Sequence, residues 1–100
     1  MDLAVVIPVR NEAPNIAPLV AEIRAALDGL VDYEIIYVDD GSTDGTVAAV
    51  EQLQRDFARL RLVRHRTRAG QSAAIRSGVK AAAAPWIATL DGDGQNDPAD

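Results

Sequence analysis

The chain of 100 residues contains no cysteine, so it has neither a disulfide framework nor a thiolate metal site. It also lacks an apolar run of roughly 18 residues, the length that a transmembrane helix needs. Its N-terminus has neither the basic segment nor the long apolar region of a signal peptide. The formal net charge of −5 argues against a nucleic-acid-binding protein, which would present a basic surface. What remains is an acidic chain whose lack of cysteine is compatible with the cytosol.

Apolar runs and helical periodicities alternate along the chain. Runs at residues 3–8, 33–38 and 86–90 predict buried strands, and a short run at residues 61–64, flanked by arginines, predicts a strand at a sheet edge. Helices are predicted from Pro14 or Asn15 to Gly29 with Pro18 in the first turn, from the cap residues 42–44 through residue 60, and at residues 71–83. The expected inward-facing residues of the second and third helices are Val47, Val50, Leu53, Phe57, Leu60, Ala74, Ile75, Gly78, Val79 and Ala82.

This alternation predicts an α/β fold with a parallel sheet in strand order 3-2-1-4, connected by right-handed crossovers. Ligands of such sheets bind at the carboxyl ends of the strands, near the point where the strand order reverses. Polar residues follow the first, second and fourth predicted strands, at residues 10–12, 39–42 and 91–93. We therefore expect these three segments to converge on one crevice.

Two aspartates after the fourth predicted strand carry the clearest chemical signal. Asp91 and Asp93 are two residues apart, so their carboxylates project to the same side of an extended chain. Hard oxygen ligands of this kind suit Mg²⁺ or Mn²⁺ shared with a diphosphate. Asp and Gly are also common turn residues, but three acids that include Asp97 would repel one another without a cation. Gln95 either offers a third oxygen ligand or faces solvent.

The other two polar segments each have an ordinary alternative. Asp39 and Asp40 can accept hydrogen bonds from a nucleotide base or ribose, or can simply belong to a capped strand-to-helix loop. Glu12 can hold the base or ribose and Arg10 can meet a phosphate, or the two can form an exposed ion pair of little energetic weight. The glycines form neither a Walker-type nor a GxGxxG loop, which argues against a P-loop NTPase or a dinucleotide enzyme.

A basic cluster, Arg64, His65, Arg66 and Arg68, stands out in this acidic chain. A solvated loop is the favoured interpretation, and contact with a diphosphate or an anionic lipid is the alternative. Gly70 and the two residues after it are typical of a helix cap, and Gly78 is expected to allow close helix packing.

Four stretches together resemble family 2 inverting glycosyltransferases of the GT-A fold, and among them the dolichyl- and polyprenyl-phosphate sugar transferases. The stretches are VIPVRNE at residues 6–12, VDDGSTDGT at 38–46, GQSAA at 70–74 and LDGDGQNDP at 90–98. The resemblance covers nearly the whole chain. It implies that residues 1–100 form the N-terminal, Rossmann-like donor-binding part of a GT-A domain.

The resemblance also implies site residues and ligands. The donor would be a UDP- or GDP-linked sugar, held by Pro8, Val9, Arg10, Glu12, Asp39, Asp40, Gly70, Gln71, Asp91 and Gly92. The metal, Mg²⁺ or Mn²⁺, would be held by Asp91, Asp93 and Gln95, and Asp93 is also the predicted catalytic residue. The sugar would be transferred to a polyprenyl (dolichyl or undecaprenyl) phosphate at the cytoplasmic face of a membrane.

Residues 96–98 are typical of a helix start, yet the chain ends two residues later. This pattern predicts a piece of a longer protein, with the acceptor site and membrane-associated segments lying beyond residue 100. The piece alone is then expected to be inactive. Its fourth strand would present an apolar sheet edge, which predicts marginal stability or self-association into a homo-oligomer.

Three alternatives remain open. The acceptor can be a polysaccharide or a glycolipid instead of a polyprenyl phosphate. A phosphoacceptor signalling domain also places acidic pairs at strand ends, but it needs a lysine late in a strand, and Lys80 falls in a predicted helix. A non-catalytic nucleotide-binding module would bind nucleotide without turnover.

Overall fold

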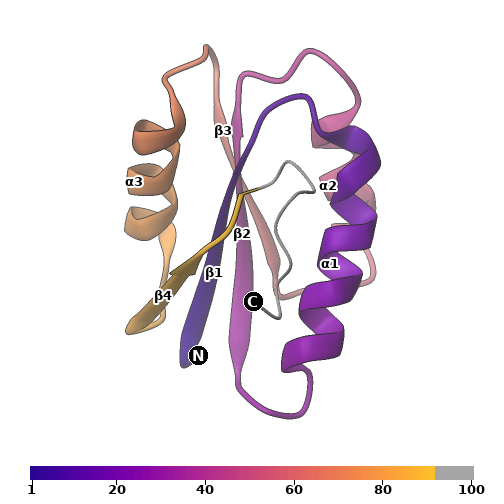
Figure 1. Cartoon of the computed structure of the whole chain (residues 1–100), viewed down its shortest axis with the longest axis vertical. Helices are drawn as coiled ribbons and strands as arrows, with labels where there is room; N and C mark the ends of the chain where they lie inside the picture. The colour runs from indigo at the N-terminus through magenta and orange to yellow at the C-terminus, as the bar shows by residue number, and fades with distance from the viewer. Residues whose placement is uncertain (92–100) are drawn as a thin grey trace.

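The structure is a computed structural model, and it describes residues 1–91 of the chain. Within these residues, four parallel strands form one sheet in the order β3-β2-β1-β4 (Figure 1). Their bounds are β1 (Leu3–Val9), β2 (Tyr33–Asp40), β3 (Leu60–His65) and β4 (Trp86–Thr89). The predicted α/β class and strand order are confirmed, and β3 lies at the edge where the arginine-flanked run was expected.

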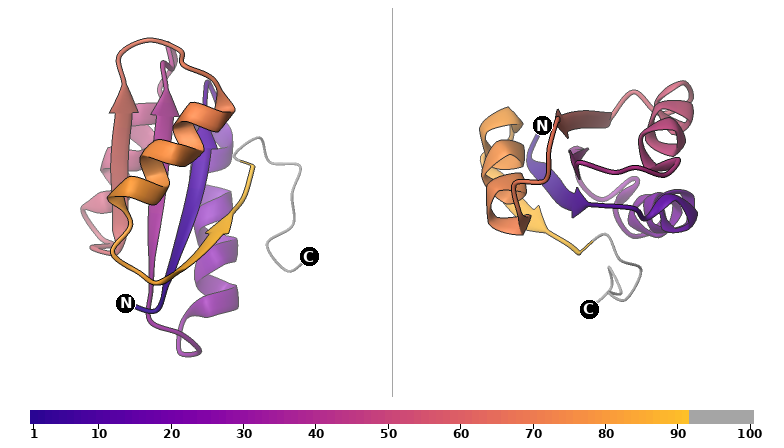
Figure 2. Two further views of the ribbon diagram at one scale, coloured as in Figure 1. Left: turned by 90° about the vertical axis from the view of Figure 1, so that its left-hand side faces the viewer. Right: turned by 90° about the horizontal axis from the view of Figure 1, so that it is seen from above.

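In the described part of the chain, three helices cover the two faces of this sheet. Helices α1 (Ala13–Leu27) and α2 (Thr46–Gln54) lie on one face, and α3 (Gln71–Ala81) lies on the other, so these residues form three layers (Figures 1 and 2). None of the helices within residues 1–91 is long and apolar enough to cross a membrane.

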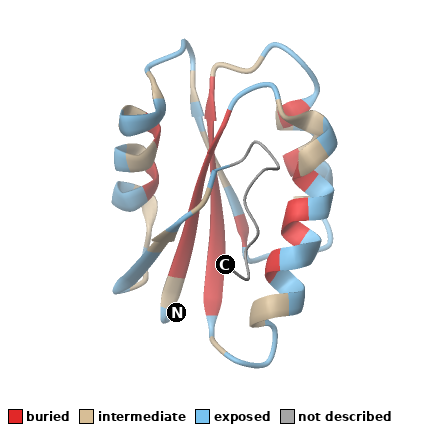
Figure 3. Ribbon diagram, viewed as in Figure 1, coloured by how far each residue is buried: buried red, intermediate tan, exposed pale blue. Residues whose placement is uncertain are grey.

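The two central strands are buried on both faces (Figure 3). Because side chains alternate along a strand, Val5 and Ile7 pack on the α1 and α2 side, whereas Ala4 and Val6 pack on the α3 side. The α3 layer packs very close to the sheet at Gly78, where a Cβ atom would lie 2.3 Å from Val6 Cγ1. The expected close packing at Gly78 is therefore confirmed.

The helices differ from the prediction in three ways. Helix α1 begins at Ala13, so Pro18 lies inside the helix, beyond the first turn where it was expected, and Gly29 follows the helix with φ +82°. Helix α2 ends at Gln54, so Phe57 is buried in the connection and Leu60 opens β3. Val79 of α3 is 45% exposed, so its predicted inward position is wrong.

Strand β4 also differs from the prediction. Trp86 is 73% exposed and Ile87 is 37% exposed, so the prediction of a buried strand there is wrong. The reason is that β4 pairs with β1 and, in the part of the chain that the structure describes, has no strand on its other side. The apolar edge expected at this strand is present.

Candidate functional site

A pocket of about 240 Å³ lies at the carboxyl ends of the strands. It is lined by Pro8, Val9, Arg10, Glu12, Asp40, Arg68, Gln71 and Asp91. These residues come from the end of β1 and the loop after it, the end of β2, the β3–α3 connection with the start of α3, and the segment after β4. The segments after strands one, two and four converge as expected. Seven of the eight lining residues were predicted site residues, and the eighth, Arg68, belongs to the basic cluster for which contact with a diphosphate was the alternative interpretation.

Asn11 ties the loop after β1 to the loop after β2. Its backbone has a left-handed φ of +55°, and its Oδ1 accepts hydrogen bonds from the amides of Thr43 (2.8 Å) and Asp44 (3.3 Å). In return, the Asn11 amide donates to Ser42 Oγ at 2.9 Å. These bonds span more than thirty residues of sequence, so no local pattern indicated them. They fix the loop that carries Arg10 and Glu12.

A second set of bonds joins the first turns of α1 and α2. The Glu12 amide donates to Thr46 Oγ1 at 2.9 Å, and Asp44 Oδ1 accepts from both the amide (2.9 Å) and the hydroxyl of Thr46. Hydrogen bonding to Thr46 lowers the pKa of Asp44 from its ordinary value. Of the three predicted cap residues, Asp44 receives the bond from the helix start. The Glu12 side chain meanwhile accepts from Asn15 Nδ2 at 2.6 Å.

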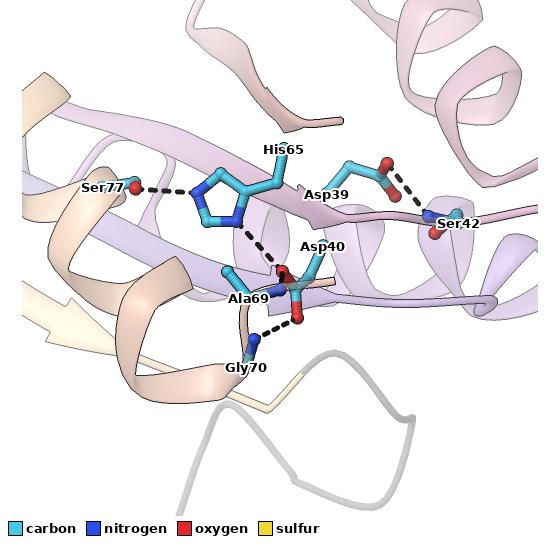
Figure 4. A network of polar contacts seen from close by, with 7 residues as sticks. All are labelled: Asp39, Asp40, Ser42, His65, Ala69, Gly70 and Ser77. Carbon is cyan, nitrogen blue, oxygen red and sulfur yellow. Dashed lines mark hydrogen bonds and ion pairs between the residues drawn. The ribbon is translucent and has the colours of Figure 1, made fainter. Parts of the chain in front are cut away.

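The adjacent carboxylates of Asp39 and Asp40 point away from each other across β2 (Figure 4). Asp39 is only 2% exposed and accepts from the Ser42 amide at 3.3 Å through Oδ2. Its Oδ1 is buried and has no hydrogen-bond partner within residues 1–91. A buried acceptor without a donor is uncommon and costly, and this oxygen is one of two such side-chain atoms in the described residues, with the Tyr37 hydroxyl.

Both carboxylate oxygens of Asp40, by contrast, accept hydrogen bonds from the protein itself. Its Oδ1 accepts from the Ala69 amide (2.8 Å) and from His65 Nδ1 (3.0 Å), and its Oδ2 accepts from the Gly70 amide (2.9 Å). Burial raises the pKa of Asp40, but these donors outweigh it and hold the pKa below its usual value. Asp40 lines the pocket, and its bonds hold the connection between β3 and α3.

Gly70 is the N-cap residue of α3, as predicted, with φ +99°. The next residue, Gln71, donates through Nε2 to Asp91 Oδ1 at 2.8 Å, which joins α3 to the segment after β4. The other predicted metal and donor residues of this segment, Gly92, Asp93 and Gln95, lie outside the described residues. Within residues 1–91 no group of three metal-ligating side chains is assembled.

The basic cluster divides between two environments. Arg64, Arg66 and Arg68 are exposed, in line with a solvated surface, but Arg68 also lines the pocket. His65, to which the sequence assigned no role, is partly buried between Asp40 and Ser77. Its partners are 25 and 12 residues away in sequence, so spacing gave no signal for this contact.

Known proteins similar to this chain include enzymes that act on polyprenyl phosphates. The dodecaprenyl-phosphate galacturonate synthase of Rhizobium johnstonii is 42% identical over the whole of this chain, which covers 30% of that protein. The dolichol-phosphate mannosyltransferase of Pyrococcus furiosus is 35% identical over 98% of this chain and 27% of its own length. The chain thus spans about a third or less of the length of these relatives.

Solved structures share the fold of this chain, and one of them was solved with a nucleotide sugar. The mannosyltransferase PcManGT of Pyrobaculum calidifontis, solved with GDP-Man and Mn²⁺, superposes with a TM-score of 0.81 at 31% identity, over 91% of this chain and 27% of its own. S. aureus TarS residues 1–349 superpose with a TM-score of 0.82 at 26% identity, over 93% of this chain and 28% of the other. The predicted GT-A fold is confirmed. Residues 4–100 match the family model of glycosyl transferase family 2, and the chain belongs to that family.

Proposed function

We propose that this chain supplies the donor site of an enzyme that transfers a sugar from a UDP- or GDP-linked donor to a polyprenyl phosphate. The observation that carries the proposal is the pocket at the carboxyl ends of the strands, which Asp40 lines. Its neighbour in β2, Asp39, adds a buried oxygen without a partner in the described chain. The names of the two relatives support the acceptor class, and the complex of PcManGT with GDP-Man and Mn²⁺ supports the donor class and the metal.

The residues divide by the chemistry that they offer. Asp39 Oδ1 can accept a base N–H or a ribose hydroxyl, which would remove the cost of its unpaired burial. Glu12 lines the pocket and offers a further carboxylate acceptor. Arg10 and Arg68 line the pocket with exposed guanidinium groups, which match the charge and geometry of a diphosphate.

Asp91 places a carboxylate at the pocket, and a carboxylate is a ligand type that Mg²⁺ and Mn²⁺ prefer. In the proposal Asp91, Asp93 and Gln95 hold the metal, which when bound would neutralise charge on the leaving diphosphate. Asp93 keeps its predicted catalytic role as part of that set. A polyprenyl phosphate is already an anionic nucleophile, so a strong base is not required of this half of the enzyme.

The acceptor site and the segments that associate with the membrane would lie outside this chain. Transfer would take place at the cytoplasmic face of that membrane. The exposed apolar edge at Trp86 and Ile87 supports the prediction of self-association when the chain is studied alone.

Calorimetric titration of UDP, GDP and CDP, with Mn²⁺ and then with chelator, tests the donor site. We expect one nucleotide to bind in a metal-dependent way. Asp39→Asn and Asp91→Asn should each weaken that binding by about tenfold, the loss expected for one hydrogen bond or ligand of a charged group. Asp2→Asn removes the same charge at the opposite end of the sheet and should leave binding unchanged.

A folded chain that binds none of the three nucleotides would contradict the donor site. Nucleotide binding without sugar transfer to polyprenyl phosphate by the whole protein that carries this chain would favour a non-catalytic module or a different acceptor.

A further inference from the structure

His65, the last residue of β3, bridges that strand and helix α3. Its Nδ1 lies 3.0 Å from Asp40 Oδ1 and its Nε2 lies 2.8 Å from Ser77 Oγ (Figure 4). The side chains of His65 and Asp40 are 17% and 8% exposed, so water competes weakly for these bonds. Because a carboxylate only accepts hydrogen bonds, Nδ1–H of His65 donates to Asp40, and Nε2 shares the second hydrogen bond with the Ser77 hydroxyl.

The carboxylate that His65 contacts is the anchor of the β3–α3 connection. Asp40 accepts the backbone amides of Ala69 and Gly70, and these two residues lie directly between Arg68 and Gln71. Both flanking residues line the pocket, and Gln71 also donates to Asp91. The backbone beside Arg68 lies close to the turn after β2, since a Cβ atom on Gly41 would approach the Arg68 amide nitrogen to 3.0 Å.

The Asp40 carboxylate must stay in one orientation to accept both amides, because each amide donates to a different oxygen. His65 donates to the same Oδ1 that accepts from Ala69, from the side of β3. Its second bond, to Ser77, ties the ring to the body of α3. A donor held on both sides restricts the carboxylate more than a solvent molecule would.

We propose that His65 is a positioning residue for the donor site. It holds the Asp40 carboxylate in the orientation that fixes the amides of Ala69 and Gly70, and thereby places Arg68 and Gln71 at the pocket. The inference rests on the proposed function, because the pocket is taken as the donor site. His65 itself does not line the pocket.

Two substitutions of nearly equal shape test the bond to Asp40. In His65→Asn the side-chain amide keeps a donor close to the Nδ1 position, whereas His65→Leu removes it. We expect His65→Leu to speed hydrogen exchange at the Ala69 and Gly70 amides by about tenfold, since about one hydrogen bond is lost. Amides in the centre of β1 and β2 should exchange as in the wild type. His65→Asn should restore most of the protection.

The enzymatic readout separates positioning from general loss of structure. In the whole protein that carries this chain, His65→Leu should raise the KM for the nucleotide sugar by about tenfold, the weight of one hydrogen bond to a charged group, with kcat changed by less than about twofold. His65→Asn should return KM to within about threefold of the wild type on the same scale. Ser77→Ala removes only the second bond and should have the smaller effect.

Equal exchange at Ala69 and Gly70 in wild type and His65→Leu would overturn the positioning role. So would a His65→Asn variant that behaves like His65→Leu. The exchange measurement needs no nucleotide, so it decides whether His65 holds the connection independently of the donor. If the wild type binds no nucleotide, the proposed function fails and the role of His65 in donor binding fails with it, whatever the exchange data show.

Discussion

Asn11 offers a direct test of how the loops around the pocket are held. The residue has φ +55°, and its Oδ1 accepts the amides of Thr43 and Asp44. These are two separable contributions, because the backbone conformation and the side-chain acceptor can be changed independently. Asn11→Ala removes both, Asn11→Gly removes only the acceptor, and Asn11→Asp keeps the acceptor.

The magnitudes follow from the geometry. A left-handed conformation costs an alanine about 1 kcal/mol, and glycine adopts it freely. Losing the short bond from the Thr43 amide costs about 1 kcal/mol, and the longer bond from Asp44 adds little. We therefore expect a loss of unfolding free energy of about 2 kcal/mol for Asn11→Ala, about 1 for Asn11→Gly and less than about 0.5 for Asn11→Asp.

Urea denaturation followed by far-ultraviolet circular dichroism measures these differences, provided that the slope with denaturant stays constant across the variants. Nucleotide affinity should fall in the same order, because Asn11 lies between Arg10 and Glu12 of the pocket. An Asn11→Gly variant as unstable as Asn11→Ala would refute the role of the positive φ. An Asn11→Asp variant as unstable as Asn11→Ala would refute the role of the acceptor.

Two further predictions concern the scaffold. Burial raises the pKa of Glu34, but the hydrogen bonds from Arg61 Nη1 (2.8 Å) and the Ala83 amide (2.9 Å) lower it below the ordinary value of 4.5. The Glu34 carboxylate therefore contributes stability above pH 4.5, and this contribution is lost as the pH falls through the folded-state pKa. The free energy of unfolding of the wild type should exceed that of Glu34→Gln by about 1–2 kcal/mol at pH 7, and the difference should become smaller below pH 4.5. Denaturation at several pH values measures this difference, and a difference independent of pH would contradict the prediction. Gly78→Ala should lower the melting temperature, because crowding against Val6 costs about 1–3 kcal/mol and exceeds the helix-propensity gain of about 1 kcal/mol. Adding Val6→Ala to this variant should recover part of the lost stability, and a higher melting temperature for Gly78→Ala would exclude the clash.

The strands and the convergence of the loops could be predicted because local sequence determines them. Continuous apolar runs mark strands that are buried on both faces, and alternation with helices then limits the topology to a few choices. Strand β4 shows the limit of this reasoning. Residues 86–89 have the same apolar pattern as β1, but the burial of a strand depends on whether a neighbouring strand lies on each side. Amino-acid composition does not indicate that.

The positions of the helix ends were harder to predict for a similar reason. Leu53, Phe57 and Leu60 keep helical spacing, yet the helix stops at Gln54 and Phe57 reaches the core from the connection. Apolar periodicity reports which side chains are buried and does not report which backbone carries them. The hydrogen bonds of Asn11 and His65 were beyond the sequence altogether, since their partners are distant along the chain.

The opposite orientations of the Asp39 and Asp40 side chains could have been predicted from the sequence. Both were assigned to a loop after a strand ending at residue 38, and were therefore expected to act together on the ligand. Strand β2 continues to Asp40, so the two side chains must point to opposite faces of the sheet. One consequence of the longer strand is that only Asp40 faces the α3 side, where Ala69 and Gly70 are.

Their hydrogen bonding then separates structure from function more clearly than residue type does. Asp40 is surrounded by donors of the protein itself, so the folded chain satisfies it without a ligand. Asp39 is equally buried but keeps one oxygen without a donor in the described chain, which is a state that folding alone does not favour. A pair of identical neighbours therefore contains one residue that stabilises the β3–α3 connection and one whose unpaired oxygen, in our proposal, accepts a hydrogen bond from the nucleotide. That asymmetry is the reason to look for the nucleotide at Asp39, with Asp40 and His65 as its support.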